Sequence, residues 1–571
     1  MSSEPSLRDI LDHEPKPLRF GTSGVRARVE ELTDVEVYCL TRGTLAYFQR
    51  IGRLVCPGHQ GEVAVPLAGD LRPSTGRLLQ ATAKGVIDAG LTVDHCGRIP
   101  TPALTYHALQ RRVASFVVTG SHIPADRNGQ KANRCDGEVL KSDEAGIVAA
   151  VEEFREREYG RPAAESPFGA DGMLKPAFRP VLPPVDPAAA EAYRNRYRQV
   201  FAGDVLRGWR VLFFEYSAVG RDLIPRILQD AGVEVIRAGR SEEFFPLDTE
   251  AISDAHLQML AELAERQGGP LHAILSTDGD SDRPLVVAVD GRDLHFIPGD
   301  LLGAIVAGYL GADAVAVPVS ANPVLEEWLG RRGVQIRRTR IGSPYVIEAM
   351  QRLRSEGFRR VMAWEANGGF LLGSDIAMGE GVLEALPTRD ATLPLLCVLA
   401  AAKGRKGGLL ELLEAFPPCY GKSDLIDDFP QEQSRRIVAW FTPEDERIKE
   451  LRFEADGIAL FDAAGNRIGF WSTGTPEAER WEAKRRLLES VFRPEDGFAP
   501  LVKLNVLDGV RCYFANGEIA HVRPSGNAPQ LRIYAFADMR DRAREIAALA
   551  VREPDGLLRR LAREVETATD Q

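Results

Sequence analysis

The amino-acid sequence repeats one pattern three times: a short apolar strand, a helix that ends at a glycine, and a second strand rich in β-branched residues. The helices are predicted over residues 72–89, 221–231 and 323–332, each followed by a stop glycine. Such βαβ units require a parallel sheet covered by helices. At 571 residues the chain is too long for one core. We therefore predict an α/β protein with three successive Rossmann-like domains built on mixed sheets.

The last part of the chain differs from this pattern. Alternating strands are predicted over 502–506, 510–514 and 519–522, and helices over 541–551 and 556–565. This order indicates a smaller C-terminal α+β domain. The charged and less regular residues 421–495 are interpreted as partly an insertion or linker, and residues 1–19 as a loose arm. The predicted domains are residues 1–185, 186–298, 299–425 and 426–571.

Composition limits the partners and the location. The net charge of −11 argues against a general nucleic-acid binder, so an anionic ligand would need a local basic pocket. The seven cysteines form no C-x-x-C pair and no metal-ligand spacing, which is typical of reduced cytosolic thiols. No stretch reaches 18 apolar residues and the N-terminus has no apolar signal region. We expect a soluble cytoplasmic protein without a membrane partner.

The first candidate site follows an apolar run at 114–118. Thr119-Gly120-Ser121-His122-Ile123-Pro124 is a sharp turn that can present the hydroxyl of Ser121, and Lys131 lies ten residues further on. A serine on a turn with a nearby cation is a candidate phosphate carrier, because the cation offsets the charge of a phosphoserine. An ordinary surface turn is an equally common explanation of this stretch taken alone.

The second candidate site is the stretch from Asp278 to Arg283, where a buried strand ends in carboxylates at 278, 280 and 282. Ligands bind outside the carboxyl ends of parallel strands, and three clustered carboxylates favour Mg²⁺. An EF-hand is excluded, because Arg283 and Val289 stand where it needs Gly and Glu. A solvated acidic turn and a haloacid-dehalogenase-like phosphatase are the alternatives; in the latter, Asp282 would replace the usual Thr or Val.

Two further loops carry polar groups suited to a sugar phosphate. The stretch 364–369 places Glu365 and Asn367 on a glycine-rich loop that could bind vicinal hydroxyls. In the stretch 521–534, Arg523 and Arg532 flank a Ser-Gly-Asn turn that could surround a phosphate. Each stretch by itself is as well explained by a structural or surface turn. A glycine-bracketed turn at 20–26 ends in Arg26 and is either a plain turn or a substrate contact.

These stretches, in this order, resemble the α-D-phosphohexomutase superfamily over nearly the whole chain. Thr119-Gly120-Ser121-His122 resembles its phosphoserine loop, and 278–283 its metal loop. Residues 365–369 stand at its sugar-binding loop, and 523–532 at its phosphate-binding loop. Residues 21–26 fit its N-terminal signature. The resemblance implies four domains around a central cleft, the first three sharing one α/β plan.

The resemblance also implies a two-step phosphoryl transfer and a set of site residues. Phosphorylated Ser121 would give its phosphate to a hexose 1-phosphate, and the hexose 1,6-bisphosphate would return its other phosphate to Ser121. One Mg²⁺ per chain and a hexose 1,6-bisphosphate activator are the implied cofactors. The implied catalytic residues are Ser121, Lys131, Arg26 and His122; the metal ligands are Ser121, Asp278, Asp280 and Asp282; and the substrate-binding residues are Arg283, Glu365, Asn367, Gly342, Arg523, Ser525, Gly526, Asn527 and Arg532.

Several positions depart from the family pattern. Asn367 and Gly369 stand where many bacterial relatives carry a serine and a histidine, Ile123 replaces an asparagine, and Asn527-Ala528 replaces Thr-Glu. The first reading is a phosphomannomutase, acting on a small-molecule hexose phosphate as a monomer or homodimer. Phosphoglucomutase or dual activity is the alternative, followed by phosphoglucosamine mutase. From other classes, a Mg²⁺-dependent sugar-phosphate hydrolase and an inactive sugar-phosphate binder stay open.

Overall fold

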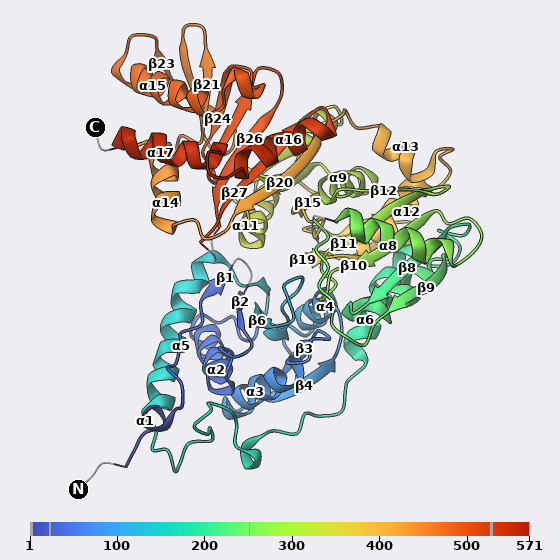
Figure 1. Cartoon of the computed structure of the whole chain (residues 1–571). Coiled ribbons are helices and arrows are strands. Elements are labelled where there is room, and N and C mark those ends of the chain that lie inside the picture. The colour runs from blue at the N-terminus through green and yellow to red at the C-terminus, as the bar shows by residue number, and fades with distance from the viewer. Residues whose placement is uncertain (1–3, 22–23, 251, 526–528, 570–571) are drawn as a thin grey trace. The chain divides into compact units, whose positions relative to one another are not determined.

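The computed structural model describes residues 4–21, 24–250, 252–525 and 529–569. The chain forms two compact units. Unit 1 comprises residues 1–315 and 342–415, and unit 2 comprises residues 316–341 and 416–571. Figure 1 labels many of the elements of the two units.

The first sheet of unit 1 is mixed. Its strand order is β1-β2-β6-β5-β3-β4, with β7 paired to β6. β4 and β5 run parallel to β3, whereas β6 is antiparallel to β5 and to β2. The strands are β1 (Phe20–Gly21), β2 (Gly24–Arg28), β3 (Ala64–Gly69), β4 (Thr92–Gly97), β5 (Ser115–Val118), β6 (Arg127–Arg134) and β7 (Gly137–Glu138). The helices of this part are α1 (Leu7–Ile10), α2 (Asp34–Arg50), α3 (Thr75–Asp88), α4 (Thr101–Arg111) and α5 (Glu144–Tyr159).

The second sheet of unit 1 has the order β12-β11-β10-β8-β9. β8 is parallel to β9 and to β10, and β11 is antiparallel to β10. Its strands are β8 (Arg210–Tyr216), β9 (Glu234–Arg240), β10 (Ala273–Thr277), β11 (Pro284–Asp290) and β12 (Asp293–Phe296). The accompanying helices are α6 (Ala188–Phe201), α7 (Ile224–Asp230) and α8 (Asp254–Glu265).

A third group of strands in unit 1 carries the predicted sugar loop. β15 is antiparallel to β16, which is antiparallel to β19, and β17 forms a hairpin with β18. The strands are β15 (Val361–Trp364), β16 (Phe370–Leu372), β17 (Ile376–Met378), β18 (Gly381–Leu383) and β19 (Leu386–Asp390). The helices are α9 (Gly299–Tyr309), α11 (Ser343–Ser355), α12 (Thr392–Ala402) and α13 (Gly408–Glu414).

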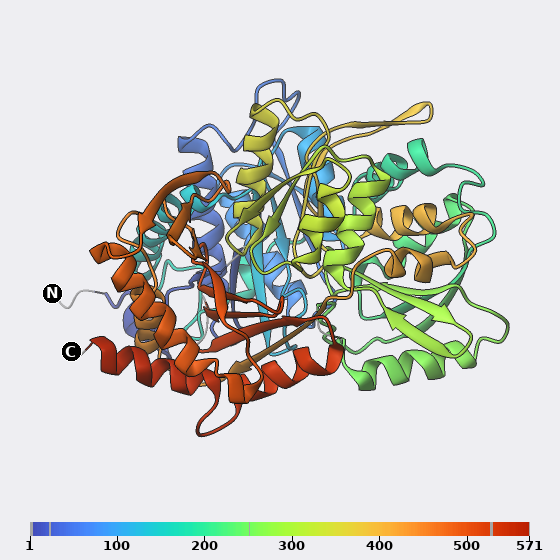
Figure 2. The same cartoon turned by 90° about the horizontal axis from the view of Figure 1, so that it is seen from above.

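Unit 2 is built on an eight-stranded antiparallel sheet of order β20-β27-β26-β25-β24-β21-β22-β23. Figures 1 and 2 show α16 and α17, the red helices, running along this sheet. The strands are β20 (Tyr420–Ile426), β21 (Glu450–Glu454), β22 (Gly457–Phe461), β23 (Arg467–Ser472), β24 (Leu501–Asn505), β25 (Val510–Phe514), β26 (Ile519–Pro524) and β27 (Leu531–Ala537). The helices are α14 (Gln431–Trp440), α15 (Pro476–Val491), α16 (Arg540–Val551) and α17 (Leu557–Thr569). β13 (Ala314–Pro318), which begins in unit 1, leads into α10 (Val324–Gly330) and β14 (Gln335–Thr339).

The three repeated units are confirmed. Gly90, Gly232 and Gly333 have φ angles of 76°, 91° and 71°, a left-handed conformation that ends each helix and that other residues rarely adopt. The mixed α/β sheets and the C-terminal strands and helices also follow the prediction. The boundaries between four domains stay a prediction.

Residues 421–495, interpreted as partly an insertion or linker, are not a linker: they form regular elements of unit 2. This stretch supplies β20 to β23, α14 and α15, which are half of the strands of the unit 2 sheet and two of its helices. Trp481 and Ile458 are buried in the same hydrophobic core as Val522 of β26. The charges that suggested a linker lie on the exposed faces of elements whose apolar faces are buried in this core.

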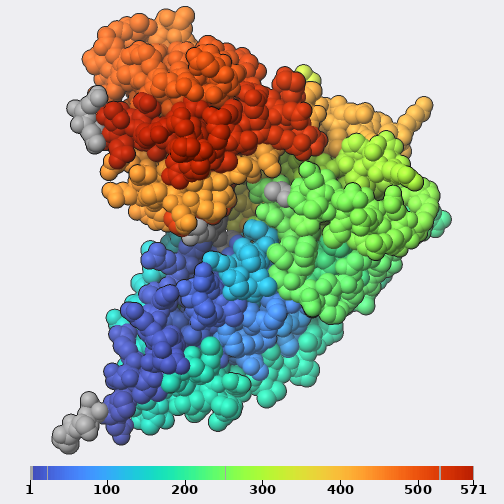
Figure 3. All heavy atoms as spheres, in the orientation of Figure 1, coloured from blue at the N-terminus to red at the C-terminus, as the bar shows by residue number. Residues whose placement is uncertain are grey.

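Within residues 1–19, interpreted as a loose arm, the described part that contains α1 is docked on the rest of unit 1. Leu7 of α1 is fully buried with Tyr159 and Phe168, and its N–H donates to the carbonyl of Arg161. Figure 3 shows the dark-blue N-terminal segment packed on teal residues of the chain. One buried leucine on a short polar helix was too weak a pattern to predict this docking.

The prediction that all cysteines are reduced was wrong for one pair. Cys56 and Cys135 form a disulfide across 79 residues. The backbone N–H of Cys56 donates to the carbonyl of Arg112, and that of Cys135 donates to the carbonyl of Arg53. These contacts join distant segments, so the spacing of cysteines in the sequence does not predict the disulfide. The disulfide removes cysteine usage as an argument for a reducing compartment. Within the described ranges, we find no helix with the length and apolar character needed to cross a membrane.

We predict that His521 makes the protein less stable in acid. His521 of β26 is fully buried, and burial and then Arg511 lower its pKa to about 3. The unfolded imidazole binds a proton below about pH 6.5, but the folded one does not, so unfolding becomes easier as pH falls from 6.5 towards 3. Between pH 7 and pH 5 this histidine should remove about 2 kcal/mol of unfolding free energy. Urea unfolding followed by circular dichroism measures it.

The variant for this test is His521→Gln, which keeps an N–H donor for the carbonyl of Asp508 that lies 2.7 Å from the imidazole. It should lose about 2 kcal/mol less than the wild type over the same pH interval. His295→Gln, at an exposed position of β12, is the matched control and should behave as the wild type. Equal pH dependence in all three proteins would contradict the prediction.

Candidate active site

Ser121 lies directly beyond the carboxyl end of β5, a strand parallel to β3. Its φ of 55° is left-handed and its side chain is buried, with 1% of the residue exposed. The hydroxyl donates a hydrogen bond of 2.6 Å to Oδ2 of Asp278, which follows β10. Strained, buried residues of this kind cluster at functional sites. The predicted approach of the serine turn to the aspartate turn is therefore present in unit 1.

The buried Arg72 shapes the serine turn. Its Nε donates to Asp70 at 3.1 Å, and Asp70 in turn accepts from the backbone N–H of Gly120. The two terminal nitrogens of Arg72 donate to four carbonyl groups of the turn, those of Ser121, Ile123, Pro124 and Arg127. Sequence reasoning missed Arg72 and Asp70. Their signal was an Asp-x-Arg triplet directly after the parallel strand β3, just as Asp278 directly follows β10.

The three aspartates of the second stretch have ligand atoms within 4.8 Å of one another, and all are buried. In Asp280 and Asp282 one oxygen is occupied: both Oδ2 atoms accept from Lys131 Nζ, at 2.6 and 2.9 Å. Their Oδ1 atoms are buried and have no hydrogen-bond partner among the residues that the structure describes. Buried carboxylate oxygens without a partner are costly. The donor set and these orphaned oxygens fit a hard divalent cation.

Mutual repulsion and nearby cations set the charge state of this cluster. Burial, and then Asp280 and Asp282, raise the pKa of Asp278 well above its usual range. Burial also acts to raise the pKa of Asp280, but the ammonium of Lys131 outweighs it, so this pKa lies below its usual range. Lys131, predicted to lie beside Ser121, contacts these aspartates and neutralises part of their charge.

A second group of possible metal ligands lies elsewhere in unit 1. Asp94, Cys96 and His107 are buried and also have ligand atoms within 4.8 Å of one another. Here, however, Oδ2 of Asp94 already pairs with His107 at 2.9 Å and with Arg111 at 3.4 Å. The charge of this carboxylate is compensated by the protein itself. The aspartate turn is therefore the better candidate for a metal ion.

Further cations surround the serine and the aspartates. Nη1 of Arg283 lies 2.6 Å from Nδ1 of His122, and burial followed by Arg283 and Arg26 lowers the pKa of His122 to about 2. The imidazole is therefore neutral at physiological pH. Arg26 is half-buried, and burial and then Arg283 lower its pKa to about 10, so it stays charged. This concentration of positive charge is suited to an anionic ligand, which in a chain with a net charge of −11 needs a local basic pocket.

The predicted sugar loop follows β15. Oε2 of Glu365 accepts a hydrogen bond of 2.9 Å from Nη1 of Arg389. Oδ1 of Asn367 accepts from the N–H of Gly369 at 3.0 Å, so this oxygen shapes the loop. Gly342 precedes α11 with a φ of 132°. Their roles in substrate binding stay predictions.

The predicted phosphate loop lies in unit 2. Arg523 and Arg532 are directly opposite each other on β26 and β27, so their side chains share one face of the sheet. Nε of Arg523 donates to Asp508 at 3.1 Å, and the N–H of Ser525 donates to the carbonyl of Gln530 at 2.9 Å. Gly526 and Asn527 lie outside the described residues. Two arginines paired across β26 and β27 make a candidate anion site within this unit.

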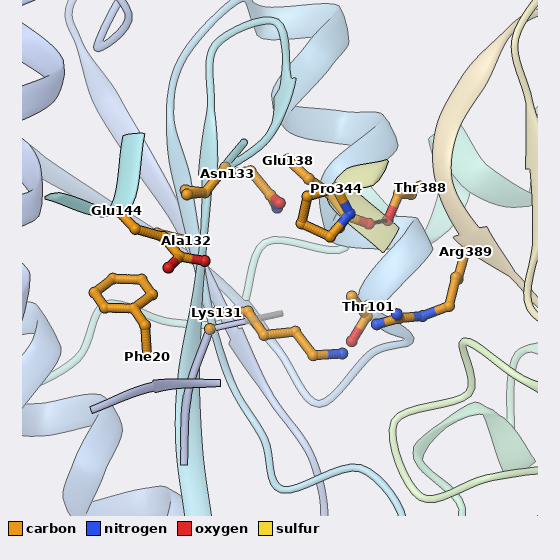
Figure 4. Close-up of a pocket in the computed structure, with 12 residues that line it drawn as sticks. Phe20, Thr101, Lys131, Ala132, Asn133, Glu138, Glu144, Pro344, Thr388 and Arg389 are labelled. Carbon is orange, nitrogen blue, oxygen red and sulfur yellow. Dashed lines mark hydrogen bonds between the residues drawn. The ribbon is translucent and has the colours of Figure 1, made fainter. Parts of the chain in front are cut away.

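Sequence reasoning also missed Thr101 and Arg389. Thr101 begins α4 and donates its hydroxyl to Oδ2 of Asp280 at 2.9 Å. Arg389 of β19 donates to Oδ2 of Asp282 from Nε at 3.0 Å and from Nη2 at 2.9 Å. Figure 4 shows Thr101, Lys131 and Arg389 pointing toward one another at one pocket. The Pro-Thr-Pro start of α4 was the only local signal for Thr101.

Comparison with known proteins agrees with this fold and site. Residues 17–158 match the family model for phosphoglucomutase/phosphomannomutase α/β/α domain I, and residues 298–420 match the model for domain III. A phosphomannomutase of Sinorhizobium fredii is 34% identical over 531 residues, which cover 93% of this chain and 97% of the relative. A phosphomannomutase of Salmonella muenchen is 34% identical over 526 residues, 92% of this chain and 93% of the relative.

A solved structure gives the same fold. The phosphoglucomutase/phosphomannomutase family protein of Burkholderia thailandensis is 18% identical with a TM-score of 0.60, and the match covers 98% of each chain. The fold and the serine–aspartate site are those of a phosphohexomutase-like protein. The chain belongs to the phosphoglucomutase/phosphomannomutase family of the α-D-phosphohexomutase superfamily.

We predict that Arg72→Met lowers the unfolding free energy by about 3 kcal/mol, because it leaves the buried Asp70 without its cation and four carbonyls without donors. Urea unfolding measures the loss, and hydrogen exchange of residues 120–127 should become faster. Arg28→Met, at an exposed arginine of β2, is the control and should change stability by less than about 0.5 kcal/mol. An Arg72 variant as stable as this control would refute the assigned role.

Proposed function

We propose that this protein is a phosphohexomutase that interconverts hexose 6-phosphate and hexose 1-phosphate, with mannose as the hexose. One observation carries the proposal: the hydroxyl of Ser121 is 2.6 Å from Asp278, the first of three buried aspartates, two of which have orphaned oxygens. A hydroxyl that faces a metal-type carboxylate cluster among cations is suited to phosphoryl transfer. The reaction proposed runs through a phosphoserine and a hexose 1,6-bisphosphate.

The atoms balance within each half of the proposed reaction. A sugar hydroxyl attacks the phosphorus of phosphoserine 121, a new P–O bond forms, and the bond from phosphorus to Oγ of Ser121 breaks. The sugar hydroxyl gives up one proton and Oγ takes one up, so no net acid or base is consumed. The bisphosphate then presents its other phosphate and the same steps run in reverse. Positioning and charge compensation supply most of such catalysis.

The residues of unit 1 have distinct parts in this proposal. Lys131, whose ammonium bridges Asp280 and Asp282, is proposed to handle the proton, and Arg26 to support the charge of the phosphoryl group. The three aspartates and a phosphoserine oxygen would hold one Mg²⁺, which when bound would neutralise charge on the transferring phosphoryl group. Glu365 is proposed to accept hydrogen bonds from sugar hydroxyls. From unit 2, Arg523 and Arg532 are proposed to bind the phosphate that does not react.

We predict that Ser121→Ala abolishes the mutase reaction, because it removes the only oxygen that the proposal uses as phosphate carrier. The assay contains mannose 1-phosphate, Mg²⁺ and a hexose 1,6-bisphosphate, and residual turnover should be below about one thousandth of the wild-type rate. Intact mass of the wild type should show a fraction carrying one phosphoryl group, which the variant lacks.

Ser142→Ala, at an exposed serine of the same unit, is the matched control and should keep full activity. Normal turnover in Ser121→Ala would refute the phosphoserine route. Release of inorganic phosphate without isomerisation would instead support the hydrolase alternative.

We predict a higher kcat/KM for mannose 1-phosphate than for glucose 1-phosphate. This preference is supported by the names of the two relatives at 34% identity. The two sugars differ only in the orientation of the C2 hydroxyl, so one or two hydrogen bonds decide between them. Both sugars are assayed side by side on one enzyme preparation. A preference for glucose would reassign the protein as a phosphoglucomutase while leaving the phosphoserine mechanism intact.

A further inference from the structure

Arg389 connects the two functional parts of unit 1. Its residue exposure is 3%, and its guanidinium donates twice to Oδ2 of Asp282 and once to Oε2 of Glu365, all at 2.9–3.0 Å. Asp282 belongs to the aspartate turn and Glu365 to the predicted sugar loop. One planar, rigid group therefore fixes a candidate metal ligand and a candidate sugar ligand relative to each other.

The charge of Arg389 is permanent. Burial acts to lower its pKa, but Asp282 and Glu365 outweigh burial, so the pKa lies well above its usual range. Removal of this side chain would leave two buried carboxylates without a cation that they now share. The contact also decides how Asp282 is oriented. Because Arg389 and Lys131 both occupy Oδ2 of Asp282, Oδ1 is left without a hydrogen bond, 3.7 Å from Nε of Arg283, and is the oxygen that fits a metal ion.

Arg389 fits only because residue 369 is a glycine. Antiparallel pairing of β16 with β19 brings Phe370 opposite Asp390, and Gly369, which directly precedes β16, lies against the stem of Arg389. A Cβ atom added to Gly369 would lie 2.6 Å from Cδ and 2.8 Å from Cγ of Arg389, closer than real Cβ atoms approach. The stem of Arg389 is enclosed and its guanidinium is anchored at both ends, so it cannot easily move aside. The packing of Arg389 therefore depends on the absence of a side chain at residue 369.

We propose that Arg389 is a positioning residue that couples metal binding at the aspartate turn to sugar binding at Glu365, and that Gly369 provides the space for it. The inference rests on the proposed function for the identity of both ligands. It differs from a purely structural role in one consequence. If the guanidinium orients both carboxylates, binding of sugar phosphate and binding of metal must strengthen each other, and the coupling must disappear when the bridge is cut.

The first test uses Arg389→Lys, which keeps the positive charge but replaces the two-ended fork by a single ammonium group. Titration calorimetry measures Mg²⁺ binding with and without mannose 1-phosphate. In the wild type the sugar phosphate should tighten Mg²⁺ binding. In the variant Mg²⁺ should bind about tenfold more weakly and no longer respond to the sugar phosphate. Arg359→Lys, at an exposed arginine of the same unit, is the matched control and should keep the wild-type response.

Two outcomes would overturn the proposal: unchanged Mg²⁺ affinity in Arg389→Lys, or weaker binding that still responds fully to the sugar phosphate. Because the titration does not require turnover, the test is separate from the proposed function. A wild type that binds both ligands cooperatively but does not isomerise the sugar would refute the mutase and keep the coupling.

The second test examines the packing without any ligand. Gly369→Ala should lower the midpoint of thermal unfolding when Arg389 is present, because the new Cβ collides with its stem. In the Arg389→Ala background the same substitution should have little additional effect, since the space is then open. Equal effects of Gly369→Ala in the two backgrounds would show that the glycine does not serve the arginine.

Discussion

Three carboxylates buried at one turn are the constraint on which the rest of unit 1 depends. Each loses its hydration, and each repels the other two, which raises the pKa of Asp278 well above its usual range. A fold can keep such a cluster only if cations are brought to it from other elements. Lys131 comes from β6 and Arg389 from β19, with Arg283 directly beyond the turn itself. The positive charge at this site thus comes from strands of separate sheets, although the whole chain has a net charge of −11.

The parallel strands explain why these groups meet. Asp70, Ser121 and Asp278 each follow the carboxyl end of a strand, β3, β5 and β10 respectively. β3 and β5 are neighbours in the first sheet, so Asp70 and Ser121 follow strands at the same edge, and Asp278 reaches them from the end of β10 in the second sheet. Hydrogen bonds then link these groups in sequence. Asp70 accepts from Arg72, and Arg72 donates to the carbonyls of the serine turn. The hydroxyl of Ser121 on that turn donates to Asp278. The strain at Ser121 is maintained by this chain of buried contacts.

Local pattern was enough to predict the elements and the chemistry-bearing turns, but not the side chains that support them. The strand–turn stretch at 119–124 and the alternating aspartates at 278–282 carry their signal within a few residues. Arg389 is separated from Asp282 by 107 residues, and nothing beside it in sequence marks it as functional. The Cys56–Cys135 disulfide and the docking of Leu7 share this property. Such contacts depend on which distant segments the fold brings together, and a single sequence contains no direct record of that.

Gly369 shows how the missing information changes an interpretation. Taken alone, a glycine in place of the family histidine suggests that the sugar loop has lost a functional group. Beside Arg389 it has the opposite meaning, because the absence of a side chain at 369 admits a larger and permanently charged one from the neighbouring strand. A departure from a family motif is therefore best weighed together with its cross-strand neighbours, since a loss at one position can be the condition for a gain at another.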